Sequence, residues 1–103
     1  MSIKKKTTKG KTVVKVTFEL AGEVASGSKD VRVLGDFNHW DHANGLVMKA
    51  SKATGVYSAS IDLESGREYA FRYLIDGTRW ENDWEADKYV GTSLGSENSV
   101  VSL

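Results

Sequence analysis

The sequence has no cysteine and no proline. Without cysteine the chain can form neither a disulfide bond nor a thiolate metal site, so packing has to supply its stability. It also lacks any apolar run close to the roughly 20 residues that a membrane-spanning helix needs. The first residues lead into an alternating pattern and not into the apolar centre of a signal peptide. These absences predict a cytoplasmic protein.

The chain is short as well. Its 103 residues suffice for one domain with one core and leave no room for a catalytic domain beside an accessory one. Hydrophobic residues make up 40% of the sequence, which separates it from the low-hydrophobicity composition of disordered chains. The start at Met1 and the end at Leu103 favour a stand-alone module over a fragment of a larger enzyme.

The net charge is zero, but the charges are unevenly distributed. Residues 1–16 contain six lysines and no acidic residue, whereas the rest of the chain has 8 basic and 14 acidic residues. A nucleic-acid-binding domain usually spreads positive charge over a folded face, with aromatic residues interleaved. We therefore expect a flexible basic arm over residues 1–11 and a single β-sandwich domain over residues 12–103, with neither nucleic acid nor membrane as a partner.

Apolar residues alternate with polar ones over most of the chain, which predicts strands with one buried face. The strongest of them, residues 67–75, places Tyr69, Phe71, Tyr73 and Ile75 on one face. About seven short strands separated by turns are typical of an all-β, immunoglobulin-like sandwich. The predicted strands span residues 14–20, 30–34, 46–49, 56–63, 67–75 and 99–103, and residues 81–98 are predicted to be an irregular loop.

Four segments occur in a particular order: residues 31–40 (VRVLGDFNHW), 65–69 (SGREY), 71–77 (FRYLIDG) and 94–101 (LGSENSVV). In this order they resemble the carbohydrate-binding module 48 family. That family includes the glycogen-binding domain of the AMP-activated protein kinase beta subunit and the N-terminal domains of isoamylases and glycogen branching enzymes. The resemblance covers roughly residues 13–103. It implies an early-set immunoglobulin-like sandwich that binds α-1,4-linked glucan, such as glycogen, starch or a maltooligosaccharide, without a cofactor. It also implies a glycogen-metabolising enzyme or a kinase as a protein partner.

The resemblance further implies which residues contact the sugar. The chain departs from the family pattern in four respects. Arg72 replaces a lysine, Ser96 replaces a threonine, one extra residue precedes Trp80, and the usual Asp-Pro after that tryptophan is Asp83-Trp84. The family's glucan-binding positions fall on Trp40, Arg72, Trp80, Leu94, Ser96 and Asn98.

Sugar chemistry gives these residue types a physical role. A pyranose ring has C–H groups on its faces and hydroxyls round its rim, so an aromatic ring can cover one face and leave the rim to hydrogen bonds. Trp40 and Trp80 are then two stacking plates, and Leu94 adds apolar surface beside them. The remaining three polar residues of the set would contact hydroxyls, because together they offer both donors and acceptors.

The extra residue before Trp80 leaves two hairpins to compare. With a two-residue turn, Tyr73 pairs with Trp80 and the indole faces the core. With a three-residue loop and Gly77 in the left-handed region, Leu74 pairs with Trp80, whose indole then shares a face with Arg72. We predict the three-residue loop, because it absorbs the insertion and keeps both indoles outward.

Other notable residues are interpreted as structural. Three roles are open to Trp84, namely a third platform for sugar, a lid on the sandwich or a crystal-contact residue, and we favour the lid. Asn38 is expected to bond backbone groups of its own turn. His39 and His42 are in a non-helical loop whose spacing does not direct both rings to one metal ion. The acids at positions 83, 85 and 87 lack the glycine and the final acid of a calcium loop.

Enzyme motifs are missing from the sequence: it has no nucleophile elbow, phosphate loop or dinucleotide fingerprint. A glycosidase would need two carboxylates at a fixed separation in a deep cleft. We predict that the chain is not an enzyme and has no catalytic or metal-binding residue. The alternative to glucan binding is a protein-interaction or regulatory sandwich of the same fold that has lost its sugar site.

Overall fold

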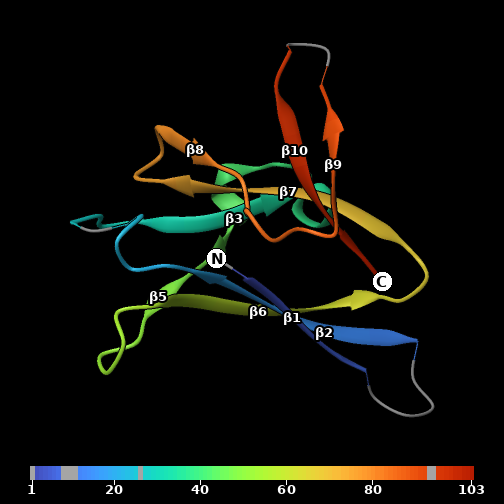
Figure 1. Ribbon diagram of the computed structural model, residues 1–103, viewed down its shortest axis with the longest axis horizontal. Coiled ribbons are helices and arrows are strands. Elements are labelled where there is room, and N and C mark those ends of the chain that lie inside the picture. The colour runs from blue at the N-terminus through green and yellow to red at the C-terminus, as the bar shows by residue number, and fades with distance from the viewer. Residues whose placement is uncertain (1, 8–11, 26, 93–94) are drawn as a thin grey trace.

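The computed structural model describes residues 2–7, 12–25, 27–92 and 95–103. These residues form two antiparallel sheets that lie one above the other, with a hairpin projecting from the upper one (Figure 1). One sheet has the strand order β1-β2-β6-β5, and the other has the order β4-β3-β7-β10-β9, with β8 also paired to β7. The predicted all-β, immunoglobulin-like sandwich is confirmed.

The first sheet contains four strands from the N-terminal half and the middle of the chain. Its strands are β1 (Ser2–Thr7), β2 (Val13–Leu20), β5 (Lys49–Ala50) and β6 (Tyr57–Glu64). The second sheet is built round β7 (Glu68–Ile75). Its other strands are β3 (Val31–Gly35), β4 (Leu46–Val47), β8 (Arg79–Glu81), β9 (Lys88–Gly91) and β10 (Glu97–Ser102). Two single-turn 3-10 helices, η1 (Asp36–Asn38) and η2 (His42–Asn44), follow β3.

The core lies between the two sheets and is built by the alternation along their strands. Phe18 from β2 packs against Phe71 from β7 with ring centroids 4.8 Å apart, and Phe71 meets Tyr73 edge-on at 5.7 Å. All three side chains are fully buried. The predicted inward face of residues 67–75 is therefore confirmed, and the opposite face of β7 is left to form the site described below.

Residues 2–7 differ from the expected flexible arm. They form β1, which pairs with β2 from Ser2 opposite Glu19 to Thr7 opposite Val14. The Nζ atom of Lys4 lies 3.4 Å from the Glu19 carboxylate, and that of Lys5 lies 2.6 Å from Asp87. This segment was not predicted as a strand, because its consecutive lysines do not alternate with apolar residues. Lysines are nevertheless common on strands at the edge of a sheet. Residues 1 and 8–11 of the expected arm lie outside the described residues.

Two further strand predictions were wrong in detail. Residues 46–49 are not one strand: β4 pairs with β3 in one sheet, β5 pairs with β6 in the other, and buried Met48 crosses between them. Residues 81–98 are not wholly irregular, because they contain β9 and the start of β10. All four residues of β9 are exposed, so no alternation marks them in the sequence. No helix among the described residues has the length and apolarity needed to cross a bilayer.

Candidate functional site

An open cavity of about 230 Å³ lies on the outer face of the second sheet. The strands β7, β8 and β10 and the loops after β3 and β9 contribute to its walls. Five of the six site residues predicted from the sequence line it, and the sixth, Leu94, lies outside the described residues. The lining residues are Trp40, Arg72, Trp80, Thr92, Ser96 and Asn98.

The turn after β3 presents Trp40. The Asn38 amide holds this turn in place, since its Oδ1 accepts from the Gly35 N–H at 2.9 Å and its Nδ2 donates to the Val33 carbonyl at 3.0 Å. The Trp40 N–H closes the turn on the Gly35 carbonyl at 3.0 Å. His39 and Trp40 both have φ of 57°, a left-handed conformation that bulky residues adopt only where the surroundings enforce it. The expected backbone role of Asn38 is therefore confirmed.

Asp36 fixes the Trp40 side chain against β7. Its Oδ1 accepts from the indole Nε1 of Trp40 at 3.0 Å, and its Oδ2 accepts from the Ala70 N–H at 2.8 Å. Gly35 makes this approach possible, because a Cβ at that position would lie 2.4 Å from the Ala70 carbonyl oxygen. Trp40 remains half-buried, with its ring on the cavity wall.

The hairpin between β7 and β8 presents Trp80. Leu74 pairs with Trp80 and Ile75 with Arg79, so the three residues 76–78 form the loop. Gly77 has φ of 70°, a left-handed conformation that costs glycine little. The predicted three-residue loop is confirmed, and with it the outward face of Trp80, which is 45% exposed.

The two indoles stand side by side at the cavity. Their ring centroids are 6.3 Å apart and their planes are tilted by 53°. Exposed large aromatic side chains are costly in water unless a ligand covers them, and a pair held at an angle suits a bent ligand that has two flat faces. The closeness of the two indoles, which come from parts of the sequence forty residues apart, is a product of the fold.

A row of polar side chains borders the indoles. The guanidinium of Arg72 donates through Nε to the Asn98 Oδ1 at 2.6 Å and through Nη2 to the Ser96 hydroxyl at 2.9 Å. Ser96 also contacts the Thr92 hydroxyl at 2.8 Å. These bonds use two of the five N–H donors of the guanidinium and fix its plane beside the cavity.

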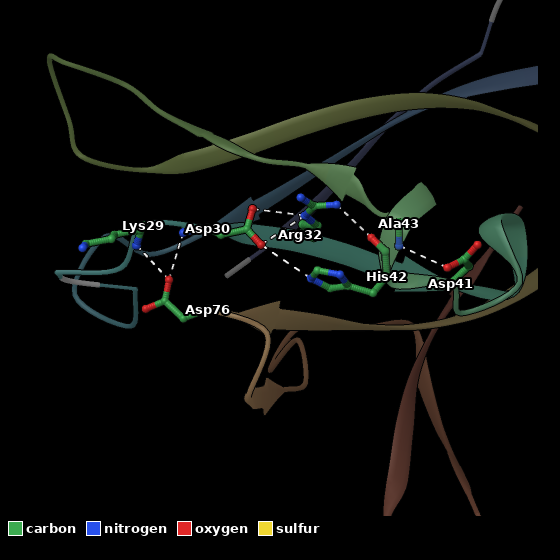
Figure 2. Close-up of polar contacts among 7 residues, drawn as sticks. All are labelled: Lys29, Asp30, Arg32, Asp41, His42, Ala43 and Asp76. Atoms are coloured by element: carbon green, nitrogen blue, oxygen red, sulfur yellow. Dashed lines mark hydrogen bonds and ion pairs between the residues drawn. The ribbon is translucent and has the colours of Figure 1, made fainter.

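A chain of polar contacts links the hairpin loop that precedes Trp80 to the loop that follows Trp40 (Figure 2). Asp76, in the loop that leads to Trp80, accepts from the N–H groups of Lys29 and Asp30 at 2.8 and 2.9 Å. The Asp30 carboxylate accepts from Arg32 at 3.1 Å, and Arg32 donates in turn to the His42 carbonyl at 2.8 Å, in the loop that follows Trp40. Because the two backbone N–H groups stabilise its charged form, the pKa of Asp76 lies below its ordinary value.

The prediction that Trp84 is a lid on the sandwich is wrong. Trp84 is 66% exposed, and the neighbouring Asp83 is the residue that is fully buried. The Tyr73 hydroxyl donates to the Asp83 carboxylate at 2.6 Å, and the Asp83 N–H donates to the Ser99 hydroxyl at 2.8 Å. These partners make burial of the acid tolerable and turn the indole outward. Burial, with the nearby Asp83 charge, raises the pKa of Tyr73 far above its ordinary value, so the phenol stays protonated.

Two residues of the site, Asp36 and Thr92, were not predicted from the sequence. Asp36 braces Trp40, and its position at the start of a turn, four residues before the tryptophan, was the available signal. Thr92 lines the cavity from the far side of the β9–β10 loop, in a segment that was expected to be irregular. In the described part of the chain, no three His, Asp or Glu side chains lie together in the way metal ligands would.

Comparison with known families agrees with this geometry. The family model for carbohydrate-binding module 48 (isoamylase N-terminal domain) matches residues 9–90. That range includes Trp40, Arg72 and Trp80 and ends before Ser96 and Asn98. A comparison with curated proteins found no match. Since the match spans most of the chain and the sandwich agrees with it, the protein belongs to the carbohydrate-binding module 48 family.

Proposed function

We propose that this protein binds α-1,4-linked glucan, such as glycogen, starch or a maltooligosaccharide, without catalysing a reaction on it. The observation that carries the proposal is the tilted pair of Trp40 and Trp80 indoles at one open cavity. Family membership supports carbohydrate as the ligand class. The α-1,4 linkage bends a glucan chain, so neighbouring glucose units present their faces at an angle to one another, as the two indoles do.

The polar row supplies the second half of the recognition. Glucose hydroxyls can donate or accept, and the row of Arg72, Ser96 and Asn98 offers both kinds of partner. The mutual bonds within the row hold these groups in place before a sugar arrives, which lowers the ordering cost of binding. Leu94 is proposed, on the family resemblance alone, to add apolar surface beside them.

The expected affinity is modest. Two stacking contacts worth about 1–2 kcal/mol each, with several net hydrogen bonds of about 1 kcal/mol, are offset in part by the ordering of a flexible sugar. The balance corresponds to a dissociation constant between about 10 μM and 1 mM. A polymer with many equivalent sites compensates for weak single contacts, so the natural ligand is proposed to be a long glucan.

Affinity electrophoresis in a glycogen-containing gel tests the proposal. The wild-type chain should be retarded relative to a gel without glycogen, and Trp40→Ala and Trp80→Ala should each lose most of that retardation. Val47→Ala is the matched control, because Val47 is an exposed apolar residue that does not line the cavity. Circular dichroism of each variant checks that the sandwich is intact.

Equal mobility of the wild-type chain with and without glycogen, confirmed by calorimetry with maltoheptaose, would contradict the proposal. The sandwich would then serve as a protein-interaction module. If glucan does bind, we propose that a protein partner, such as a glycogen-metabolising enzyme or a kinase, uses a surface away from the indole pair, because a polymer covering the cavity would compete with it.

A further inference from the structure

A second groove lies beside the first cavity and contains two more exposed aromatic residues. Its volume is about 560 Å³. Trp84 is 66% exposed and Tyr89 is 41% exposed, and both line this groove. Ser96 lines both the groove and the first cavity, so the two hollows adjoin at that residue. The groove is lined by Asn82, Asp83, Trp84, Tyr89, Gly95, Ser96 and Glu97.

Hydrogen bonds hold the backbone beside Trp84 and the side chain of Tyr89 in place. Asp83, next to Trp84, is fully buried, and besides its bonds to Tyr73 and Ser99 its carboxylate accepts from the Glu85 N–H at 2.8 Å. The Tyr89 hydroxyl donates to the Asp83 carbonyl oxygen. Trp84 is thus exposed by a backbone that is anchored on both sides of it, and little conformational entropy would be lost when a ligand covers the ring.

The two hollows lie on opposite sides of β10. Side chains alternate along a strand, and Asn98 lines the first cavity whereas Glu97 lines the second. The β9–β10 hairpin projects from the body of the sandwich (Figure 1). Ser96, in the loop of this hairpin, is exposed and lines both hollows. A bent chain that lies on the Trp40–Trp80 pair can therefore continue past Ser96 to the other side of the hairpin.

The chemistry of the groove suits a neutral sugar. Its aromatic residues can cover C–H faces, and the exposed Glu97 carboxylate can accept hydrogen bonds from hydroxyls. The acidic residues at this end, Asp83, Glu85 and Glu97, disfavour phosphate-bearing polymers. Continuity with the first cavity makes the occupant the same glucan chain and not a separate ligand.

We propose that the Trp84–Tyr89 groove is a second glucan subsite, which is filled only by chains long enough to pass Ser96. This inference rests on the proposed function, since it extends the same glucan from the first cavity. It assigns to the protein a preference for long chains over short ones. A short oligosaccharide occupies the Trp40–Trp80 pair alone, and a longer one gains an additional stacking contact on Trp84.

Calorimetric titration with maltotriose and maltoheptaose separates the two sites. Trp84→Ala should weaken maltoheptaose binding about tenfold, the equivalent of one lost stacking contact, and should change maltotriose binding less than about twofold. Trp80→Ala should weaken the binding of both sugars. Trp84→Tyr should retain most of the length preference, because a phenol ring still offers a flat face. Val47→Ala again serves as the exposed apolar control.

A fluorescence measurement reports on Trp84 directly. The chain has three tryptophans, so the difference in fluorescence between the wild-type chain and Trp84→Phe isolates the signal of Trp84 while the Trp40–Trp80 pair stays intact. At saturating sugar, maltoheptaose should protect Trp84 from quenching by acrylamide, and maltotriose should not.

The outcomes are distinguishable. If the wild-type chain binds both sugars and Trp84→Ala binds maltoheptaose as tightly as wild type, the second subsite is overturned while the proposed function stands. If the wild-type chain binds neither sugar, both fall. A third outcome is that sedimentation shows a dimer for the wild-type chain and a monomer for Trp84→Ala, while the variant binds maltoheptaose as tightly as the wild type. This result would assign the groove to a second copy of the chain and overturn the proposal.

Discussion

Aromatic residues from one short stretch of sequence lie on both faces of β7, and the two faces differ in how far these residues are buried. On the inner face, Phe71 and Tyr73 are fully buried in the core. On the outer face, Arg72 borders a cavity, and Trp80 from the paired β8 is 45% exposed there. Hydrophobicity does not separate these residues, because tryptophan is as apolar as the buried rings. What separates them is register, since one residue more or less in the hairpin loop would exchange the faces of Trp80.

The largest effect is expected on the inner face. Phe71→Ala should lower the free energy of unfolding by about 3–5 kcal/mol, because it removes a fully buried ring and leaves a cavity between Phe18 and Tyr73. Trp80→Ala, its counterpart on the outer face, should change stability by less than about 1 kcal/mol while it impairs glucan binding. Urea denaturation of both variants measures the contrast. Equal losses of stability would show that Trp80 belongs to the core after all.

The next largest loss of stability is expected at the buried hydrogen bond between Tyr73 and Asp83. Tyr73→Phe should cost about 1.5–3 kcal/mol at neutral pH, because it removes the hydrogen bond to the buried Oδ2 of Asp83, while the other carboxylate oxygen keeps its bond from the Glu85 N–H. Tyr73 has a raised pKa in the folded state, so the unfolded chain loses that proton first as the pH rises. Wild-type stability should therefore fall above about pH 10, by up to about 1.4 kcal/mol per pH unit from this group. Tyr73→Phe should show a shallower decline over the same range, and parallel curves would contradict this account.

A smaller loss of stability is expected when Asp36, which holds Trp40 on the outer face, is substituted. Asp36→Ala removes the acceptor for the Trp40 indole and the Ala70 N–H, and should cost about 1 kcal/mol in stability. Glucan affinity should fall as well, because the released indole has to be reordered on binding. Asp36→Asn keeps one acceptor oxygen and should lie between Ala and wild type. Calorimetry with maltoheptaose and thermal unfolding give the two readouts, and an unchanged affinity in Asp36→Ala would deny Asp36 its positioning role.

The smallest effect is expected at the hairpin loop. The pKa of Asp76 is lowered in the folded state, so the stability that this group contributes is present above its unfolded pKa and is lost as the pH falls through the folded value. Wild-type stability should decline at acid pH, starting near pH 4. Asp76→Asn, which tolerates the left-handed conformation at φ of 53°, should have a flatter acid limb. Identical acid limbs in denaturation experiments would show that the loop anchor carries no pH-dependent stability.

Much of the fold follows from local pattern. The alternation in β2 and β7 fixes their inner faces. Strand geometry reduced the hairpin before Trp80 to two alternatives, and the requirement that both indoles face outward selected the three-residue loop that the structure has. Three features could not be predicted because their causes are non-local. β1 is a strand only because β2 offers an edge, β9 is exposed on every residue, and residues 46–49 divide where buried Met48 changes sheets.

The candidate site shows the same division. Trp40, Arg72 and Trp80 occur in recognisable motifs, and the fold brings them to one cavity. The outward position of Trp84 could not be predicted, because it depends on the burial of its charged neighbour Asp83. That burial depends in turn on a tyrosine ten residues earlier and on Ser99 from β10. A hydrophobic residue beside an acid is normally expected to be the buried one of the two.

The central position of β7 links ligand occupancy to the integrity of the whole sandwich. β8 and β10 both pair with it, and the Asp36 brace of Trp40 ends on its backbone at Ala70. If β7 is not hydrogen-bonded to β8 and β10, Trp40 and Trp80 do not come together. A glucan bound to these two indoles would therefore favour the state in which all three strands are paired. By mass action, sugar at a hundredfold excess over its dissociation constant would add about 2.7 kcal/mol to the unfolding free energy. Adsorbed to a polysaccharide particle, the module would resist heat and proteolysis better than it does in dilute solution.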